Sequence, residues 1–356
     1  MIIVIPSIRN INLEYLKPLL NRGNKIIVVD DTDEERITVN ADEVTVLHYS
    51  DKKRILGDLE SCIPKKNGVC RDLGLLMAYH LAEDNETIVC LDDDCQVFDN
   101  YQNKAETSLG IKELPLVTTS HRFYNPLDLY DQDIEIFPRG FPYEERGRPK
   151  DYKYNKTIKR NIVFNLGLWK GVFDINAVDK LYLEKFSFNE IKLNYRQVIV
   201  DKGPFVSLCS MNIIMKKEII PAIYQLPMNE PIIPNWQIDR YGDIWGGYIC
   251  KKLIDIKGDA LSVGESLIYH HKDSSLEKNI RQEHYAHIVN IRFCDLIDKA
   301  CEAIKKDSYL SMYDQFVCNL DSLKKDYPES LKNYLLPTVN KMKTWITALK
   351  LKDIKI

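Results

Sequence analysis

Three consecutive carboxylates, Asp92, Asp93 and Asp94, follow a short apolar run at residues 88–91. The run is typical of a buried strand, and the crevice beyond the carboxyl ends of the strands is the usual ligand site of an open α/β sheet. Three packed acids repel one another unless a cation neutralises them, and hard divalent cations prefer oxygen ligands. The cluster therefore predicts a Mg²⁺ or Mn²⁺ site that holds a diphosphate group. A solvated acidic turn is the alternative, and the tripeptide alone fits both.

Two other predicted strand ends carry residues that suit a nucleotide. Apolar runs at residues 2–5 and 25–29 predict parallel strands joined by a short helix. Pro6 and Arg9 follow the first strand and Asp30 follows the second, which brings an arginine for phosphate and an acid for the base or ribose to one edge. No GxGxxG sequence is present, so a dinucleotide-binding fold is not indicated.

Arginines elsewhere also suit a phosphate. Arg71 lies in the first turn of a helix predicted at residues 70–82, where a cation is unfavourable against the helix dipole unless an anion meets it. A solvent-facing arginine is the alternative interpretation. Arg139 and Arg146 lie in a loop at residues 137–146 that is rich in Pro, Gly and aromatic residues. A loop of this kind can close over a bound diphosphate.

A second polar cluster contains Asp239, Arg240 and Asp243, followed by Trp245. Asp243 is predicted either to face a sugar or simply to be favoured at the start of a helix by the dipole. Further along, His270 follows a strand-like run. A lone histidine is usually structural, but at a strand end it could complete a metal site with the acidic cluster.

The composition is that of an ordinary globular protein. Hydrophobic residues make up 45% and charged residues 28% of the 356 residues, enough for a sizeable core. The formal net charge of -3 gives no electrostatic case for binding nucleic acid. No apolar run approaches the roughly 18 residues that span a bilayer. Nine cysteines without a CxxC pair favour reduced thiols, so we expect a cytoplasmic protein.

The pattern divides the chain after residue 275. Residues 1–275 are expected to form the catalytic domain, with an irregular polar segment before Lys66 and an irregular stretch at residues 114–203. Residues 276–356 are predicted to form a helical region that packs on the sheet or on a second subunit. Its helices are expected at residues 280–304, 309–323 and 328–351.

The joint order of these clusters resembles that of the reversibly glycosylated polypeptides, the UDP-arabinopyranose mutase family, up to about residue 290. No single motif is diagnostic, but their succession is. The matching motifs are IPSIRN (5–10), CRDLG (70–74), LDDDC (91–95), RGFPY (139–143) with Arg146, GLW (167–169), CSMN (209–212), RYGDIWGG (240–247) and YHHK (269–272). The chain departs from the plant pattern at residues 143–145 and at Gly242.

The resemblance implies an α/β fold of GT-A type, with a mostly parallel sheet flanked by helices. It implies an enzyme that interconverts pyranose and furanose forms of a nucleotide-linked sugar, with Mn²⁺ or Mg²⁺ as cofactor. The substrate is expected to be a UDP-sugar, with a GDP-sugar as the alternative. We also expect a homo-oligomer with no nucleic-acid partner.

The expected roles of the site residues follow from the motifs. Metal ligation is expected for Asp92, Asp94 and His270. Nucleotide contacts are expected for Pro6, Arg9, Asp30, Arg71, Asp92 and Asp93. Sugar contacts are expected for Trp169, Asn212, Asp239, Arg240 and Trp245. Catalytic roles are expected for Arg139, Arg146 and Asp243.

Arg139 corresponds to the arginine at which the family is reported to glycosylate itself. A guanidinium has a pKa above about 12 and no free lone pair, so we expect it to act electrostatically, with glycosylation as a side reaction. Asp243 is our choice for the carboxylate that stabilises positive charge at the anomeric carbon or moves a hydroxyl proton. Two other functions stay open, a GT-A glycosyltransferase and a non-catalytic, self-glycosylated subunit.

Overall fold

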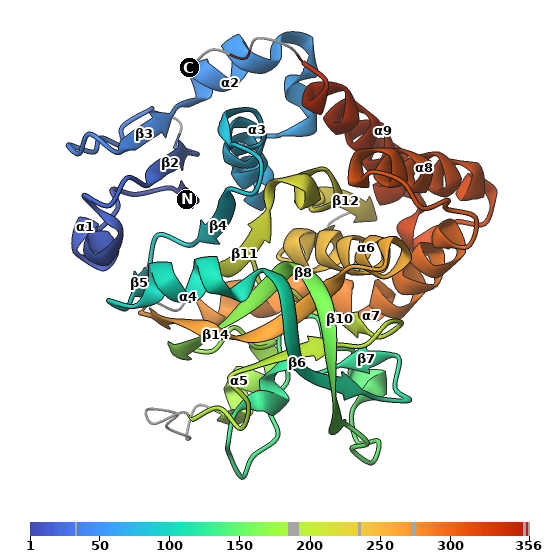
Figure 1. Ribbon diagram of the computed structural model, residues 1–356. Helices are drawn as coiled ribbons and strands as arrows, with labels where there is room; N and C mark the ends of the chain where they lie inside the picture. Colours follow the sequence, from blue (N-terminus) through green and yellow to red (C-terminus); the bar gives the residue numbers. More distant parts are fainter. Residues whose placement is uncertain (33, 184–191, 234–235, 272–274, 352–353, 355–356) are drawn as a thin grey trace.

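The computed structural model describes the chain apart from residues 33, 184–191, 234–235, 272–274, 352–353 and 355–356. Its described residues form a sheet of ten strands in the order β3-β2-β1-β4-β11-β8-β6-β9-β14-β5. Helices flank this sheet, and the C-terminal helices lie on the side away from the first three strands (Figure 1). The prediction of an α/β protein with a helical C-terminal region is confirmed.

The N-terminal half of the sheet is parallel, as expected. Its strands pair in parallel register and are β1 (Ile2–Ser7), β2 (Lys25–Asp30), β3 (Val44–Leu47) and β4 (Thr87–Leu91). The helices between them are α1 (Leu13–Leu16), α2 (Tyr49–Leu56) and α3 (Arg71–Leu81). Since parallel strands end at the same edge, the residues after β1, β2 and β4 are brought together there.

The other half of the sheet is mixed. Its strands are β5 (Cys95–Val97), β6 (Gly110–Thr118), β8 (Lys153–Gly171), β9 (Gln197–Val200), β11 (Asn212–Lys216) and β14 (Ala260–His270). Strand β11 runs antiparallel to both β4 and β8, so it joins the two halves. Strand β14 runs parallel to β8, which carries His270 to the edge that β4 also reaches.

Two expectations about irregular segments are wrong. Residues 114–203 contain the 19-residue strand β8, whose first half is polar and largely exposed and therefore lacks an apolar run. The segment before Lys66 forms α2, where the backbone N–H of His48 donates to Asp51 at 2.9 Å and caps the helix start. Strand β8 is defined by its pairing with neighbouring strands and α2 by the cap at its start. Neither feature appears as an apolar periodicity in the sequence.

The smaller elements lie around these two halves. The short strands are β7 (Phe123–Tyr124), β10 (Phe205–Val206), β12 (Glu230–Ile233) and β13 (Trp236–Ile238). The remaining helices before the C-terminal region are α4 (Tyr101–Ser108), α5 (Ala177–Leu183) and α6 (Gly242–Lys257). The 3₁₀ turns are Lys17–Leu19, Gly57–Cys62, Gly68–Cys70, Pro126–Leu129, Tyr143–Glu145, Lys217–Ala222 and Leu323–Lys325.

Helix α6 approaches the segment before it very closely. A Cβ atom at Gly242 would press against the backbone carbonyl of Leu226, and one at Gly246 against that of Tyr224. Only glycine allows this approach without a shift of the helix. The departure from the family pattern at Gly242 therefore fits a helix whose first turn is pressed against its neighbour.

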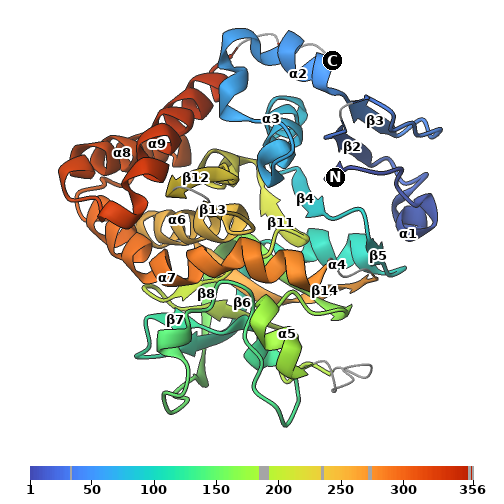
Figure 2. The same cartoon turned by 180° about the vertical axis from the view of Figure 1, so that it is seen from behind.

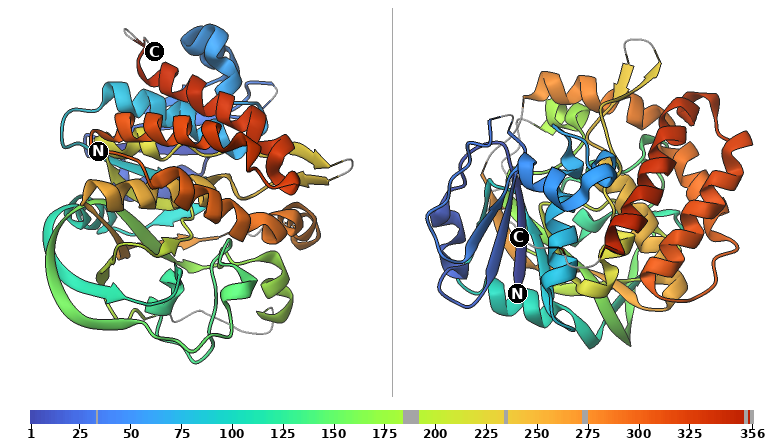
Figure 3. Two further views of the ribbon diagram at one scale, coloured as in Figure 1. Left: turned by 90° about the vertical axis from the view of Figure 1, so that its right-hand side faces the viewer. Right: turned by 90° about the horizontal axis from the view of Figure 1, so that it is seen from above.

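The C-terminal region consists of α7 (Leu276–Cys301), α8 (Tyr309–Ser322) and α9 (Glu329–Leu349), close to the expected bounds. Helix α7 lies beside α5 and α6 (Figure 2), and α8 packs against both α7 and α9, so that the three C-terminal helices form one group (Figure 3). Trp345 of α9 stacks on Tyr224 with ring centroids 5.3 Å apart. None of the helices formed by the described residues is long and apolar enough to cross a lipid bilayer.

Candidate functional site

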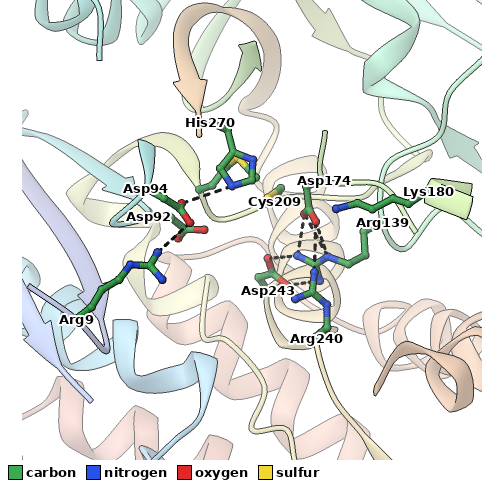
Figure 4. A pocket seen from close by; sticks show the side chains of 11 residues that line it. Arg9, Asp92, Asp94, Arg139, Asp174, Lys180, Cys209, Arg240, Asp243 and His270 are labelled. Atoms are coloured by element: carbon green, nitrogen blue, oxygen red, sulfur yellow. Dashed lines mark hydrogen bonds and ion pairs between the residues drawn. The ribbon is translucent and has the colours of Figure 1, made fainter. Parts of the chain in front are cut away.

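Two adjoining compartments lie at the carboxyl edge of the parallel strands. We call the smaller one, of about 230 Å³, the inner compartment, and Figure 4 shows its lining. The outer compartment, of about 350 Å³, extends from Pro6 and Arg71 to helix α7. Four side chains line both: Asp92, Arg139, Arg240 and Asp243. These four mark the junction of the two compartments.

The acidic cluster forms the turn between β4 and β5 and lines one wall of the inner compartment. Ser7, the last residue of β1, and Arg9, two residues further on, both donate hydrogen bonds to Asp93. Arg9 also donates to Asp94 at 3.0 Å. Asp93 and Asp94 are therefore compensated by residues at the end of β1, and Asp92 and Asp94 line the compartment.

Arg71 is a buried partner of the acidic turn, with 2% of its surface exposed. Its guanidinium donates to the backbone carbonyl of Leu91 at 2.9 Å and to the carboxylate of Asp92. Burial raises the pKa of Asp92, and the charge of Arg71 offsets part of that rise. Of the two interpretations of Arg71, the solvent-facing one is excluded, because the cation meets a carboxylate.

His270, the last residue of β14, lies beside Asp94 in the lining of the inner compartment. Its Nδ1 lies 2.7 Å from the carbonyl oxygen of Val172, which only accepts hydrogen bonds, so in the neutral ring this nitrogen carries the proton. The other nitrogen, Nε2, lies 3.5 Å from Asp94 Oδ1. Burial alone would raise the pKa of Asp94, but His270, when it is protonated, and Arg9 hold it below its ordinary value.

Asp94 and His270 can supply two of the ligands that a divalent cation needs. Asp94 Oδ1 is buried, and no hydrogen-bond donor among the described residues reaches it. It lies beside Nε2, whose lone pair is free in the tautomer that Val172 selects. The described residues contain no ready group of three His, Cys, Asp or Glu ligands, and Arg71 binds Asp92 Oδ1. Any further ligands would come from a diphosphate and water, as is usual for Mg²⁺.

The opposite wall is built around Arg139. Its Nε donates to Asp174 Oδ1 at 3.0 Å and its Nη2 to Asp174 Oδ2 at 2.9 Å. From the other side, Asp243 accepts from Nη1 at 3.3 Å and from Nη2 at 3.1 Å. Although burial acts the other way, Arg139 holds the pKa of Asp174 well below its ordinary range. The guanidinium thus bridges two carboxylates.

Sequence reasoning missed Asp174. It stands alone in an unremarkable stretch, three residues beyond the end of β8. Had that strand been recognised, its position near a strand end would have been the signal. Lys180 and Cys209 also line the inner compartment and were not expected there.

Arg240 connects the junction to the C-terminal region. Its Nε donates to Glu283 of α7 at 2.8 Å, and its Nη2 lies 3.7 Å from Asp174. Burial raises the pKa of Glu283, and Arg240 offsets part of the rise. Asp239, also expected at the site, lines the outer compartment and accepts a hydrogen bond from Gln282.

Several expected site residues line neither compartment. Arg146 pairs with Asp179 at 2.8 Å, and its guanidinium lies over the rings of Phe137 and Tyr143. Asp30 accepts from the backbone N–H groups of Thr32 and Ile37 and holds the loop after β2. Asp93 is bound by Ser7 and Arg9. Three others are buried in the interior: Trp169, Asn212 and Trp245.

Comparison with known proteins now identifies the class to which this fold and site belong. The model of the family described as reversibly glycosylated polypeptide matches residues 1–353, and the chain belongs to that family. UDP-arabinopyranose mutase 1 of Arabidopsis thaliana is 28% identical over 353 residues, covering 97% of this chain and 91% of the relative. UDP-arabinopyranose mutase 3 of the same plant is 30% identical over 291 residues, covering 79% and 73%. The resemblance seen in the motifs is confirmed.

Proposed function

We propose that this protein is a nucleotide-sugar mutase that interconverts the pyranose and furanose forms of a UDP-linked sugar of the arabinose type. One observation carries the proposal: the acidic turn and the Arg139 cluster face each other across a compartment joined to a second one. Such a pair of compartments accommodates a sugar and a nucleotide with the diphosphate at their junction. The names of the plant relatives support this substrate class.

The charges around the junction favour a divalent cation as cofactor. Each of the four arginines at the site, Arg9, Arg71, Arg139 and Arg240, is within ion-pair distance of a carboxylate. The charge of the arginines is therefore largely compensated before a diphosphate binds, and the further cations at the site are Lys180 of the inner and Lys278 of the outer compartment. We propose that Asp94 and His270, with Asp92 nearby, hold Mn²⁺ or Mg²⁺. When bound, the cation acts as a Lewis acid that neutralises charge on the departing diphosphate.

Ring contraction requires the sugar to leave the diphosphate, because a glycoside cannot open. The bond from C1 to the diphosphate oxygen breaks, and its electron pair leaves with the nucleotide. O4 then loses its proton and bonds to C1, after which the C1–O5 bond breaks and O5 takes up a proton. Finally the diphosphate oxygen returns to C1. Each bond that forms is matched by one that breaks, so no oxidant or reductant is needed.

We propose Asp243 as the carboxylate that stabilises the cationic C1 and moves the proton from O4 to O5. It is the second residue of α6 and receives a hydrogen bond from Ser210 Oγ at 3.3 Å as well as those from Arg139. The bonds from Ser210 Oγ and Arg139 Nη1 are both 3.3 Å, longer than usual, so the carboxylate keeps acceptor capacity for a hydroxyl. Arg139 fixes its orientation, and self-glycosylation at Arg139 is proposed as a side reaction.

Three further features belong to the proposal: the cell compartment, the nucleotide and the assembly. All nine cysteines are unpaired, which favours the reducing conditions of the cytoplasm. The nucleotide is proposed to be UDP in preference to GDP because of the relatives' names. A homo-oligomer also remains our proposal.

The test is incubation of the protein with UDP-arabinopyranose and Mn²⁺, followed by chromatography of the nucleotide sugars. A mutase yields UDP-arabinofuranose, whereas a glycosyltransferase without acceptor yields free sugar or no change. Asp94→Asn should remove most of the activity and the Mn²⁺ dependence of UDP binding in calorimetry. Asp99→Asn, an exposed acid after the same turn, is the control. Absence of furanose across a panel of UDP- and GDP-sugars would refute the proposal.

A further inference from the structure

Helix α7 forms part of the outer compartment. Lys278 and Gln282, one turn apart on this helix, both line it. Residues four apart lie on the same face of a helix, so α7 presents one face to the compartment. The helix belongs to the region in which the sequence showed no chemistry. The site is therefore completed by residues from the C-terminal helices.

Glu283, the next residue of α7, is a buried carboxylate with a donor on each oxygen. Only 1% of its surface is exposed. Oε1 accepts from Arg240 Nε at 2.8 Å, and Oε2 accepts from the backbone N–H of Ala177, the first residue of α5, at 2.8 Å. A buried charge is tolerated only when it is paired and hydrogen-bonded, and here both conditions are met. The carboxylate is thus fixed by two separate elements.

Arg240 is held in a defined orientation at the junction. Its backbone φ is +62°, in the left-handed region that non-glycine residues seldom adopt. Such a conformation persists only where the surroundings determine it, and the bond to Glu283 is one such constraint. With Nε bonded to Glu283, the plane of the guanidinium is fixed. Its side chain lines both compartments, where the diphosphate is expected.

We propose that Glu283 is a positioning residue that orients Arg240 to bind the diphosphate of the nucleotide sugar. This inference rests on the proposed function. The sequence predicts a sugar contact for Arg240, and its position at the junction leads us to propose a diphosphate contact in its place. A guanidinium binds phosphate oxygens best in a planar, two-pronged geometry, so its orientation matters as much as its charge.

Glu283→Gln tests the proposal, because the amide keeps the shape but loses the charge that holds Arg240. Loss of the Glu283 charge also frees the charge of Arg240, but we expect the loss of orientation to dominate, so that the KM for the nucleotide sugar and the Kd for UDP with Mn²⁺ each rise at least about tenfold. The kcat is expected to change less, since a diphosphate contact is made throughout the reaction. A purely structural role would instead lower the folded fraction and leave KM unchanged. Glu277→Gln, an exposed acid on the same helix, is the control.

Arg240→Lys provides a second variant, which leaves the Glu283 carboxylate in place and changes only its partner. Lysine keeps the charge but lacks the Nε donor, so KM and Kd should rise as in Glu283→Gln. In an Arg240→Gln background, Glu283→Gln should change KM by less than about twofold, because the two residues act as one unit. If Glu283→Gln fails to fold, Arg240→Lys still tests whether an oriented guanidinium at position 240 binds the diphosphate.

The outcomes separate this inference from the proposed function. If the wild-type protein forms furanose but Arg240→Lys keeps wild-type KM and Kd, the positioning role is overturned while the function stands. The same holds if the effects of Glu283→Gln and Arg240→Gln multiply in the double variant. If the wild-type protein forms no furanose but UDP affinity falls in both variants, the mutase proposal fails and the role of Glu283 in phosphate binding is retained.

Discussion

The guanidinium of Arg139 lies between Asp174 and Asp243, with three hydrogen bonds toward Asp174 and two toward Asp243. Its charge is compensated on both sides, and its nitrogen lone pairs are delocalised. Both facts argue against Arg139 as a nucleophile. They favour a residue that holds two carboxylates at a fixed separation beside the sugar. We therefore expect Arg139 to act through Asp243, which lies outside the motif at residues 139–143.

Arg139→Lys should lower kcat/KM at least about tenfold, because an ammonium group is a point charge that cannot bridge two carboxylates in one plane. The rate of furanose formation measures the effect. Arg148→Lys, an exposed arginine near the same loop, should keep wild-type activity. Full activity of Arg139→Lys would remove the bridge from the mechanism.

Asp243→Asn should lower kcat by about a hundredfold, since the amide neither compensates a cationic C1 nor accepts the O4 proton. The melting temperature should stay close to that of the wild type, because Asp174 still binds Arg139. Steady-state kinetics together with a thermal unfolding scan check both parts. Near-wild-type turnover in a folded Asp243→Asn variant would lead us to withdraw the assignment.

At the scale of the elements, the site is assembled where strands and helices begin or end. The strand before Asp92 and the strand before Arg9 were predictable, because both are short, buried apolar runs. Asp174 and Glu283 were not: one follows a strand whose first half is polar, and the other lies inside a helix whose pattern reports only packing. Sequence motifs thus located the acidic wall and Asp243, whereas Asp174 and Glu283 reach Arg139 and Arg240 only through tertiary packing.

Gly246→Ala should destabilise the protein by about 1–3 kcal/mol, the usual cost of overpacking. The added methyl group would meet the backbone carbonyl of Tyr224, which cannot rotate away. The displaced helix would also carry Asp243 with it, so activity should fall. Gly68→Ala, whose Cβ would lie 3.9 Å from Gln225, is the control for stability in urea unfolding. An unchanged unfolding midpoint for Gly246→Ala would contradict the close packing of α6.

His287 of α7 should make stability depend on pH. Burial, followed by the charge of Arg146, lowers the pKa of His287 from 6.5 to about 4. Between about pH 4 and pH 6.5, His287 is therefore protonated in the unfolded chain and neutral in the folded protein. Stability from this group is complete above pH 6.5 and is lost as the pH falls toward 4, by at most about 3 kcal/mol.

Urea unfolding of His287→Gln between pH 7 and about pH 4.5 tests this expectation, because glutamine does not titrate. The variant should lose less stability on acidification than the wild type does. Equal slopes for His287→Gln and the wild type would show that another group titrates.

At the scale of the whole molecule, the C-terminal helices are continuous with the rest. Side chains of α7, α8 and α9 belong to the same buried core as those of the parallel strands. Trp245 of α6 lies against Phe293 of α7, with ring centroids 4.4 Å apart. The sequence predicts a division after residue 275, and this stays a prediction. The contacts described here join the residues on the two sides of that position in one core.

Removal of residues 276–356 should therefore abolish folding rather than leave an active core. The truncated chain would expose the apolar face of α6 and lose Glu283, so we expect aggregation or a broad, non-cooperative thermal transition. Circular dichroism and size-exclusion chromatography check this. A soluble, cooperative fragment 1–275 would instead establish it as an independent domain.

The pairing of every site arginine with a carboxylate bears on selectivity inside a cell, where free phosphate and many phosphorylated metabolites compete for cationic pockets. A guanidinium that already faces an aspartate or glutamate attracts a lone anion weakly. A nucleotide sugar that arrives with its own metal ion brings the charge needed to replace those partners. We therefore expect inorganic phosphate to inhibit this protein only weakly, so that abundant small anions leave the site open.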